Sequence, residues 1–164
     1  MIAVIGGAGY IGSHTVKYLV ERGEQVVVFD NLSTGNREFV HKEAAFLEGD
    51  LANVQDLNQL FEQYPTIQAV IHFAAFAYVC ESVKEPAKYY RNNLNSTIVL
   101  VELMIKYGVK NLVFSSSATV YGTPKVVPIT EDADTGKTTN PYGRTKCMIE
   151  EILMDVQHVE KSMN

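Results

Sequence analysis

A tyrosine and a lysine lie four positions apart in the segment PYGRTK, as Tyr142 and Lys146. Residues with this spacing share one face of a helix. Pro141 is typical of the first position of a helix, and Asn140 is a plausible cap before it. The helix dipole and the ammonium group one turn later both favour an ionised phenol. The spacing therefore predicts a catalytic pair in which the tyrosine acts as a base, although such pairs are common on helices.

A run of hydroxyl side chains follows the apolar residues 111–114, in the segment FSSSATVYG. Neither a carboxylate nor an imidazole is adjacent in the sequence, and the GxSxG pattern of a hydrolase nucleophile is absent. A hydroxyl in this run is therefore predicted to orient a substrate alcohol by hydrogen bonding. Taken alone, a serine-rich strand end is mostly a capped turn.

Three glycines at three-residue intervals, Gly6, Gly9 and Gly12, stand in GGAGYIGSH. Such glycines allow a tight turn, close approach to a pyrophosphate and close helix–strand contact, and the helix N-terminus favours phosphate. Asp30 ends the next apolar run, where its carboxylate can bind a ribose diol and would repel a 2′-phosphate. The pattern predicts an NAD site, and a packing loop with a capping aspartate is the weaker alternative.

The elements that must position these groups alternate along the chain. Apolar runs predict strands at 2–6, 25–30, 44–50, 68–74 and 111–116, and helical patterns lie at 10–22, 53–63, 86–107 and 141–160. Strands that are apolar on both faces belong in a parallel sheet covered on both sides. The order predicts an α/β protein with a doubly wound parallel sheet, the Rossmann fold. Ligands of such sheets lie at the carboxyl ends of the strands, where Asp50 is expected either beside the adenine or as a turn residue.

The two long predicted helices carry distinctive stripes. Residues 86–107 have two apolar stripes, which are Ala87, Tyr90, Leu94, Ile98, Val101 and Ile105, and Leu100, Leu103, Met104 and Tyr107. One stripe is expected to cover the sheet, and the other needs internal packing or a subunit interface. In residues 141–160, a single stripe toward the core is predicted from Tyr142, Lys146, Ile149, Leu153 and Val156.

Length and composition favour one globular domain over residues 1–164. The chain is 46% hydrophobic and 20% charged, and its net charge of −5 gives no support to nucleic-acid binding. No apolar run approaches the length of a membrane span. Two cysteines, Cys80 and Cys147, are too few for a disulfide framework, and no ligand cluster predicts a metal. With no basic leader at Met1, these features predict a cytoplasmic protein.

Taken together, the motifs resemble the extended short-chain dehydrogenase/reductase family. The similarity includes DNLSTGNRE, EGDL, HFAA, ESVKEPAKYYRNN and the more discriminating SSSATVYG, and it runs through essentially all 164 residues. It implies an NAD-dependent inversion at C4 of a UDP-hexose. Tyr142 would remove the proton of the 4′-hydroxyl while a hydride passes to the nicotinamide, and the hydride would return to the other face of the 4-keto sugar.

The resemblance also implies roles for individual residues. Ser117 would hydrogen-bond the 4′-hydroxyl, with Thr119 and Tyr142 beside the sugar. Lys146 would bind the nicotinamide ribose and favour the ionised tyrosine. The implied cofactor contacts are Gly6, Gly9, Tyr10, Ile11, Gly12, Asp30, Asn31, Asp50, Leu51, Phe73, Ala74, Asn92, Tyr142 and Lys146. Helices 86–107 and 141–160 would form the homodimer of the family.

Members of the family continue into a C-terminal substrate domain, so the chain is expected to be the NAD-binding part, truncated relative to the family. Two alternatives follow. Dehydratases and decarboxylases of the same superfamily carry an acidic residue after the strand-five hydroxyls, and Ala118–Thr119 at that place counts against them. A catalytically silent NAD-binding module is the other alternative, because positioning of the sugar would require the binding energy of the further domain.

Overall fold

A computed structural model describes residues 1–164, and a parallel five-stranded sheet forms its centre. The strands are β1 (Ile2–Ile5), β2 (Val26–Asp30), β3 (Ala45–Glu48), β4 (Ala69–His72) and β5 (Asn111–Phe114). Their order is β3-β2-β1-β4-β5, so the chain leaves β1 first to one side and later to the other. This reversal confirms the predicted doubly wound α/β fold.

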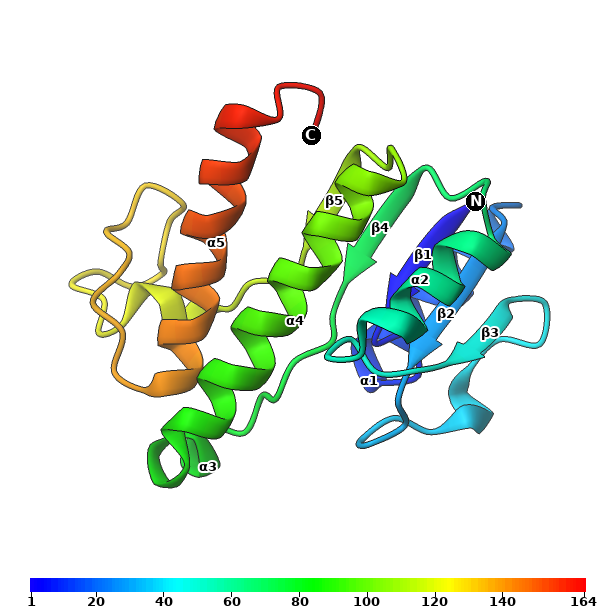
Figure 1. The fold of residues 1–164 in the computed structure, drawn as a ribbon. Helices are drawn as coiled ribbons and strands as arrows, with labels where there is room; N and C mark the ends of the chain where they lie inside the picture. The colour runs from blue at the N-terminus through cyan, green and yellow to red at the C-terminus, as the bar shows by residue number, and fades with distance from the viewer. The chain divides into compact units, whose positions relative to one another are not determined.

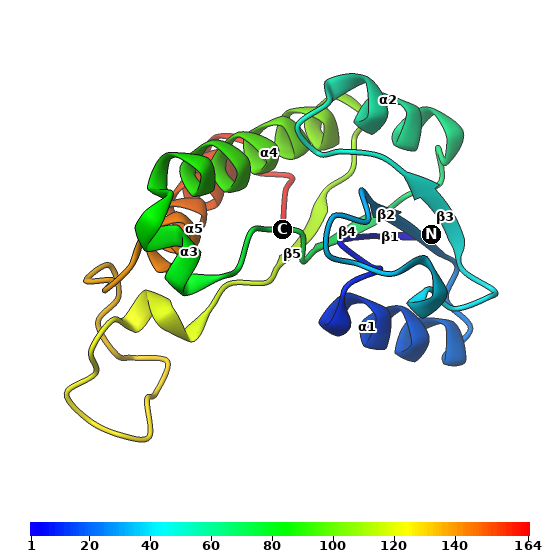
Figure 2. The same ribbon diagram turned by 90° about the horizontal axis from the view of Figure 1, so that it is seen from below.

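Helices cover both faces of this sheet (Figures 1 and 2). Helix α1 (Tyr10–Glu21) lies on one face and α2 (Val54–Gln63) on the other. The C-terminal end of α4 (Pro86–Lys106) lies on the α2 side, where Tyr107 stacks on Phe61 with ring centroids 5.3 Å apart. The Tyr107 hydroxyl also donates a hydrogen bond to Asn58 Oδ1 at 2.9 Å. Coverage on both faces explains why all residues of β2 are buried.

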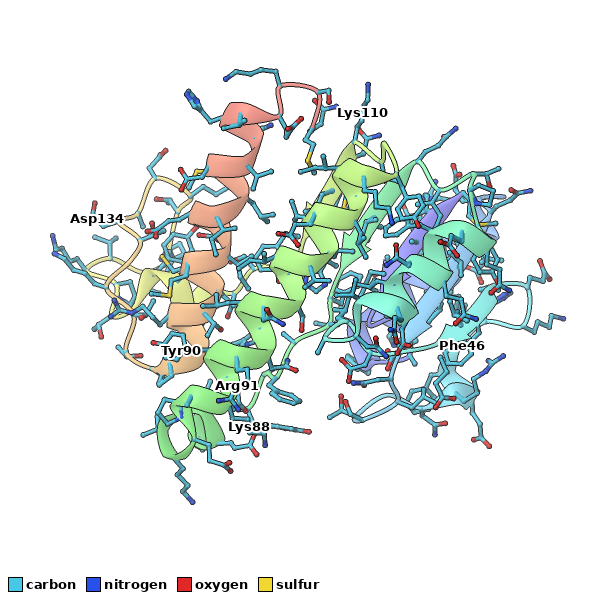
Figure 3. The ribbon with its side chains drawn as sticks, in the orientation of Figure 1. Phe46, Lys88, Tyr90, Arg91, Lys110 and Asp134 are labelled. Atoms are coloured by element: carbon cyan, nitrogen blue, oxygen red, sulfur yellow. The ribbon has the colours of Figure 1, made fainter.

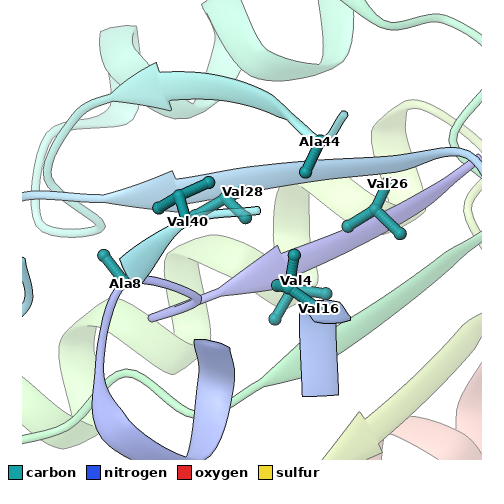
Figure 4. Packing of buried hydrophobic residues seen from close by; sticks show 7 residues of the cluster. All are labelled: Val4, Ala8, Val16, Val26, Val28, Val40 and Ala44. Atoms are coloured by element: carbon teal, nitrogen blue, oxygen red, sulfur yellow. The ribbon is translucent and has the colours of Figure 1, made fainter. Parts of the chain in front are cut away.

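The α1 side of the sheet has a compact apolar cluster (Figure 4). Strands β1 and β2, helix α1, the loop between β1 and α1 and the segment between β2 and β3 contribute to it. Its buried members are Val4, Ala8, Val16, Val26, Val28, Val40 and Ala44. Full burial of a valine side chain contributes about 1.5–3 kcal/mol, so this cluster holds α1, and the glycine loop before it, against the strand ends.

The chain packs as two compact units. The first comprises Met1–Ala75, Ile98–Ser115 and Ser162–Asn164, and it holds the whole sheet. The second comprises Phe76–Thr97 and Ser116–Lys161. It contains α3 (Val79–Lys84), the N-terminal part of α4, the short 3-10 helix η2 (Ala118–Tyr121) and α5 (Pro141–Val159). A second 3-10 helix, η1 (Arg37–Phe39), belongs to the first unit.

Helix α3 was not predicted, and side chains of α4 hold it in place. Lys88 Nζ lies 2.6 Å from Glu81 Oε1, and the buried Tyr89 donates its hydroxyl to Glu81 Oε2 at 2.7 Å. Tyr89 in turn accepts the N–H of Tyr78 at 3.1 Å. Figure 3 shows Lys88 beside Arg91 on the first part of α4. The contacts fix α3 to α4 although α3 has only six residues.

Helix α4 confirms two apolar stripes but buries them unequally. In the second stripe Leu100, Leu103 and Met104 are buried. In the first, Val101 is buried, whereas Ile98 is 39% exposed and Ile105 is 40% exposed. No helix of the chain is both long enough and apolar enough to span a membrane. No group of three or more His, Cys, Asp or Glu side chains is placed to hold a metal ion.

Candidate cofactor and catalytic site

Two glycines of the loop between β1 and α1 are required by the fold itself. Gly6 has φ +78°, and a Cβ on it would lie 2.6 Å from the backbone nitrogen of Ala74. A Cβ on Gly12 would overlap the carbonyl oxygen of Gly6. A side chain at either position would therefore strain the turn or push the helix away from the strand.

Gly9 is different, because the protein leaves room beside it. The only atom within 4 Å of an added Cβ would be the Gly6 carbonyl oxygen, at 3.4 Å. Gly9 is the N-cap of α1, with φ −76° and ψ 174°, and no side chain caps the helix there. The first N–H groups of a helix have no intrahelical acceptor, and the dipole makes that end positive. The open space at Gly9 therefore fits a pyrophosphate.

Two large side chains stand at the same end of α1. Tyr10 is 78% exposed and Ile11 is 61% exposed. Large apolar side chains at a helix start lose contact with water when a ligand covers them, which is favourable. Tyr10 also packs edge-on against His14, with ring centroids 5.0 Å apart, so it has a defined position beside the loop.

Asp30, at the end of β2, holds the glycine loop in place. Its Oδ2 accepts the N–H of Ala8 at 2.9 Å, and its Oδ1 accepts the N–H of Leu32 at 2.8 Å. The carboxylate is thus a structural anchor, as the weaker alternative expected. Each oxygen has a second acceptor position, so the anchor remains compatible with a ribose diol.

The residues after β2 and β3 are joined by a side-chain hydrogen bond. Asn31 Nδ2 donates to Asp50 Oδ2 at 3.0 Å. Asp50 Oδ1 also accepts the N–H of Ala52 at 2.8 Å, so Asp50 is a turn residue as well. Leu51, the next residue in the chain, is buried. The turn role proposed for Asp50 is confirmed, and its carboxylate stands at the carboxyl edge of the sheet.

The segment after β4 is tied to the end of β1, where the glycine loop begins. The N–H groups of Phe73 and Ala74 both donate to the Ile5 carbonyl, at 2.8 Å and 3.2 Å. Ala74 is also the residue that a side chain on Gly6 would strike. The first unit thus gathers most of the expected cofactor residues at one edge of the sheet. They are Gly6, Gly9, Tyr10, Ile11, Gly12, Asp30, Asn31, Asp50, Leu51, Phe73 and Ala74.

The second unit contains the tyrosine–lysine pair. Asn140 caps α5 by accepting the N–H of Gly143 at 2.8 Å, and Pro141 is the first helical residue, as predicted. Tyr142 is half-buried in the first turn, whereas Lys146 is only 3% exposed. Burial lowers the pKa of Lys146 from 10.5 to about 8, while the negative charge of Glu150 opposes this effect. The prediction that the lysine is not merely solvated is confirmed.

Ser117 is next to the first turn of α5 through η2, which packs against that helix. Its Oγ accepts the N–H of Thr119 at 3.2 Å and is 2.9 Å from Thr119 Oγ1. Thr119 is in close contact with Gly143, because a Cβ there would be 2.9 Å from Thr119 Oγ1. Ser117 is therefore a cap, as the structural alternative expected. With its oxygen accepting from Thr119, its own O–H can donate to a substrate oxygen.

A buried amide supports α5 and was not found by sequence reasoning. Asn93 Nδ2 donates to Thr145 Oγ1 at 3.0 Å and to the Phe76 carbonyl at 3.1 Å, and its Oδ1 accepts the Phe76 N–H at 2.9 Å. Thr145 Oγ1 donates to the Tyr142 carbonyl at 2.7 Å. The expected cofactor residue Asn92 donates to Asn93 Oδ1 at 3.0 Å. The network fixes the backbone of the turn between Tyr142 and Lys146.

Comparison of the sequence with known protein families identifies the family of this chain. The sequence profile of the NAD dependent epimerase/dehydratase family matches residues 2–162. The chain belongs to this family. This match confirms the family resemblance of the motifs, and it extends over nearly the whole chain.

Relatives of this family member are UDP-glucose 4-epimerases. That of Haemophilus influenzae is 51% identical over 166 residues, which cover 97% of this chain and 49% of the relative. That of Lacticaseibacillus casei is 52% identical over 152 residues, covering 93% of this chain and 45% of the relative. The chain therefore spans about half the length of the curated relatives it matches.

The fold is also similar to solved structures of such enzymes. A crystal structure of UDP-glucose 4-epimerase from Bifidobacterium longum in complex with NAD⁺ and UDP matches with a TM-score of 0.94 at 42% identity. The match covers 99% of this chain and 50% of that one.

Proposed function

We propose that this chain carries the NAD site and the acid–base groups of a UDP-glucose 4-epimerase. The main support is sequence identity to enzymes of that name. One of them is 51% identical over 97% of the chain. The residues expected to do the chemistry, Ser117, Tyr142 and Lys146, occur in ordered local structure around the start of α5. The substrate would be a UDP-hexose.

The residues present fit NAD. The open space at Gly9, where an added Cβ would meet only one atom within 4 Å, leaves a cradle at the N-terminus of α1. The peptide N–H groups of Tyr10 and Ile11 would hold the pyrophosphate there. Asp30 and Asn31 would bind the adenosine ribose, and Asp50 and Leu51 would lie at the adenine. When bound, NAD supplies reversible oxidation at C4 of the sugar.

The side chains of the second unit would handle the proton. Tyr142 would take the proton of the 4′-hydroxyl through its phenolate oxygen and return it at the end of the cycle. Ser117 would donate its O–H to the same substrate oxygen, which orients the sugar. Lys146 would bind the nicotinamide ribose, and its positive charge would favour the phenolate. Asn92 would also contact the cofactor.

The proposed assembly is a homodimer through α4 and α5. Partly exposed apolar side chains on both helices support it. They include Ile98 and Ile105 on α4 and Met154, 61% exposed, on α5. Burial of such side chains between subunits would remove them from water. The mass of the purified chain in solution tests this point.

The function is tested by supplying UDP-galactose to the purified chain and measuring UDP-glucose, together with NAD released on denaturation. Conversion in the wild type that Tyr142→Phe abolishes, with bound NAD unchanged, is the expected result. Tyr18→Phe is the matched control, because Tyr18 is an exposed residue of α1 outside the proposed catalytic groups. Bound NAD without conversion would instead favour an NAD-binding module that is catalytically silent. Absence of both NAD and conversion would refute the proposal.

A further inference from the structure

A carboxylate lies one helical turn beyond Lys146 and is held from outside the helix. The Ser116 hydroxyl donates a hydrogen bond to Glu150 Oε1. Ser116 belongs to the segment that follows β5 and immediately precedes Ser117. Glu150 follows Lys146 by four residues, so both lie on the same side of α5. The contact connects two residues 34 positions apart, and both belong to the second unit.

Lys146 needs a counter-charge because of its burial. An ammonium group taken out of water loses hydration that only nearby polar or negative groups can replace. Glu150 is the charged group whose attraction opposes the effect of burial on the pKa of Lys146. It is half-buried itself, so its charge is screened less than that of an exposed carboxylate.

Other ionisable groups on α5 and on the elements near it are less suited to this role. Glu81 of α3 is already paired with Lys88 and hydrogen-bonded by Tyr89. Glu151 is adjacent to Glu150 but exposed. None of these groups adds to the electrostatic causes that act on Lys146. The remaining ionisable side chains of α3, η2 and the first part of α5 are Cys80, Lys84, Tyr121, Tyr142, Arg144 and Cys147.

We propose that Glu150, anchored by the Ser116 hydroxyl, is a positioning residue that keeps Lys146 charged and in place beside Tyr142. The proposal rests on the role of Lys146 in the proposed function. The carboxylate of Glu150 accepts from Ser116, which fixes that hydroxyl as a donor. The anchor therefore also holds the segment that carries Ser117 against the helix that carries Tyr142 and Lys146. Neither Ser116 nor Glu150 needs to touch a substrate to have this effect.

The test is an NMR titration of the lysine side-chain ¹³Cε signals in the full 164-residue chain. The Lys146 signal is assigned by its loss in Lys146→Arg. Glu150→Gln keeps the shape of the side chain and an acceptor for Ser116 but removes the charge. We expect the pKa of Lys146 to fall by about 0.5 or more in this variant, because an attractive charge has been removed. Glu151→Gln is the matched control, with the same charge change on the exposed neighbour, and it should leave the titration unchanged.

Two further variants make the outcome decisive. Ser116→Ala releases the anchor but keeps the carboxylate, so the pKa of Lys146 should fall by less than in Glu150→Gln. Glu150→Asp keeps the charge and should restore most of the wild-type titration. An unchanged Lys146 titration in Glu150→Gln, with a native amide spectrum, would overturn the proposal. If Glu150→Gln does not fold, an unchanged titration in Ser116→Ala overturns the anchoring.

This measurement is independent of turnover. The titration reports the charge on Lys146 whether or not the chain binds NAD or converts a UDP-sugar. A chain that shows neither bound NAD nor conversion but shows the expected titration would refute the proposed function and keep the Glu150 inference. The reverse result would refute the inference alone.

Discussion

The glycines between β1 and α1 allow folding and cofactor binding to be separated by mutation. Gly9→Ala adds one methyl group at a position with φ −76°, which L-residues adopt readily, and with one neighbouring atom at 3.4 Å. Gly6→Ala adds the same methyl group at φ +78°, 2.6 Å from the Ala74 nitrogen. The two variants have the same composition, so only the surroundings of the methyl group differ.

The expected loss of stability differs accordingly. At Gly9, alanine is a poorer N-cap than glycine, which costs about 1 kcal/mol or less. At Gly6, the left-handed conformation costs about 1–2 kcal/mol, and the overlap with Ala74 costs a further 1–3 kcal/mol or so. For Gly9→Ala, the affinity for NAD should change more than the stability does. A methyl group in the space open to the pyrophosphate should weaken binding at least about tenfold, which corresponds to 1.4 kcal/mol.

Urea unfolding gives the stability of each variant, and calorimetric titration with NAD gives its affinity. Comparable slopes of the free energy of unfolding against urea concentration are the control, because they show that the unfolded states are similar. Gly9→Ala should stay close to the wild type in urea and lose affinity for NAD. A Gly9→Ala variant that binds NAD like the wild type would refute the reasoning. So would one that loses as much stability as Gly6→Ala, because Gly9 would then serve the fold.

Three other substitutions test the second unit. Between pH 8 and 10.5 the unfolded chain binds the Lys146 proton more tightly than the folded chain, whose pKa is about 8, so this group makes stability rise with pH in that window. Lys146→Met should accordingly be more stable than the wild type by up to about 3 kcal/mol at pH 7, and urea unfolding should show the difference shrinking toward pH 10.5. Asn93→Leu leaves the N–H and C=O of Phe76 without their partner and should cost about 2–4 kcal/mol in urea, whereas the exposed Asn95→Leu should change little. Tyr89→Phe should lower the thermal midpoint, since the free energy of unfolding loses about 1–3 kcal/mol. Burial raises the pKa of Tyr89 from 10.0 to about 12. The stability that depends on the protonated Tyr89 is therefore fully present below pH 10, and the wild type loses this advantage over Tyr89→Phe as the pH rises toward 12.

The fold could be predicted because each strand and each long helix has its own periodicity. Helix α4 was expected at 86–107 and runs over Pro86–Lys106, and β2 was expected at 25–30 and runs over Val26–Asp30. Helix α3 had no such signal. A helix of six residues is too short to be stable by propensity alone, and α3 depends on contacts with Lys88 and Tyr89 of α4.

Strand ends were less predictable than strand centres. The strand expected at 44–50 ends at Glu48, and the next residues form a turn. There the Asp50 N–H donates to Asp56 Oδ2 at 2.9 Å, and Asp50 Oδ1 accepts from Ala52. A side chain six residues later thus takes part in this turn, and periodicity does not contain that information.

The candidate site likewise contains residues that local sequence signals predict and residues that they do not. Glycine spacing and a carboxylate at a strand end are local signals, and they predicted the loop and Asp30. The network around Asn93 has no local signal, because a polar face on a helix usually indicates contact with water. On α4 this face is buried and includes Asn93, Ser96 and Thr97. The partner of Asn93, Thr145, is 52 residues away, so only the folded chain brings them together.

Lys146 shows that stability and the proposed chemistry make opposite demands on one residue. A buried ammonium group that loses its proton at about pH 8 rather than 10.5 destabilises the folded chain at neutral pH. An apolar residue of similar length would remove that cost. The proposed function nevertheless needs the positive charge, because Lys146 would bind the nicotinamide ribose. Lys146→Met should therefore raise stability and, if the proposed function holds, abolish epimerisation in the same protein, whereas a lysine with a purely structural role would lose stability when replaced.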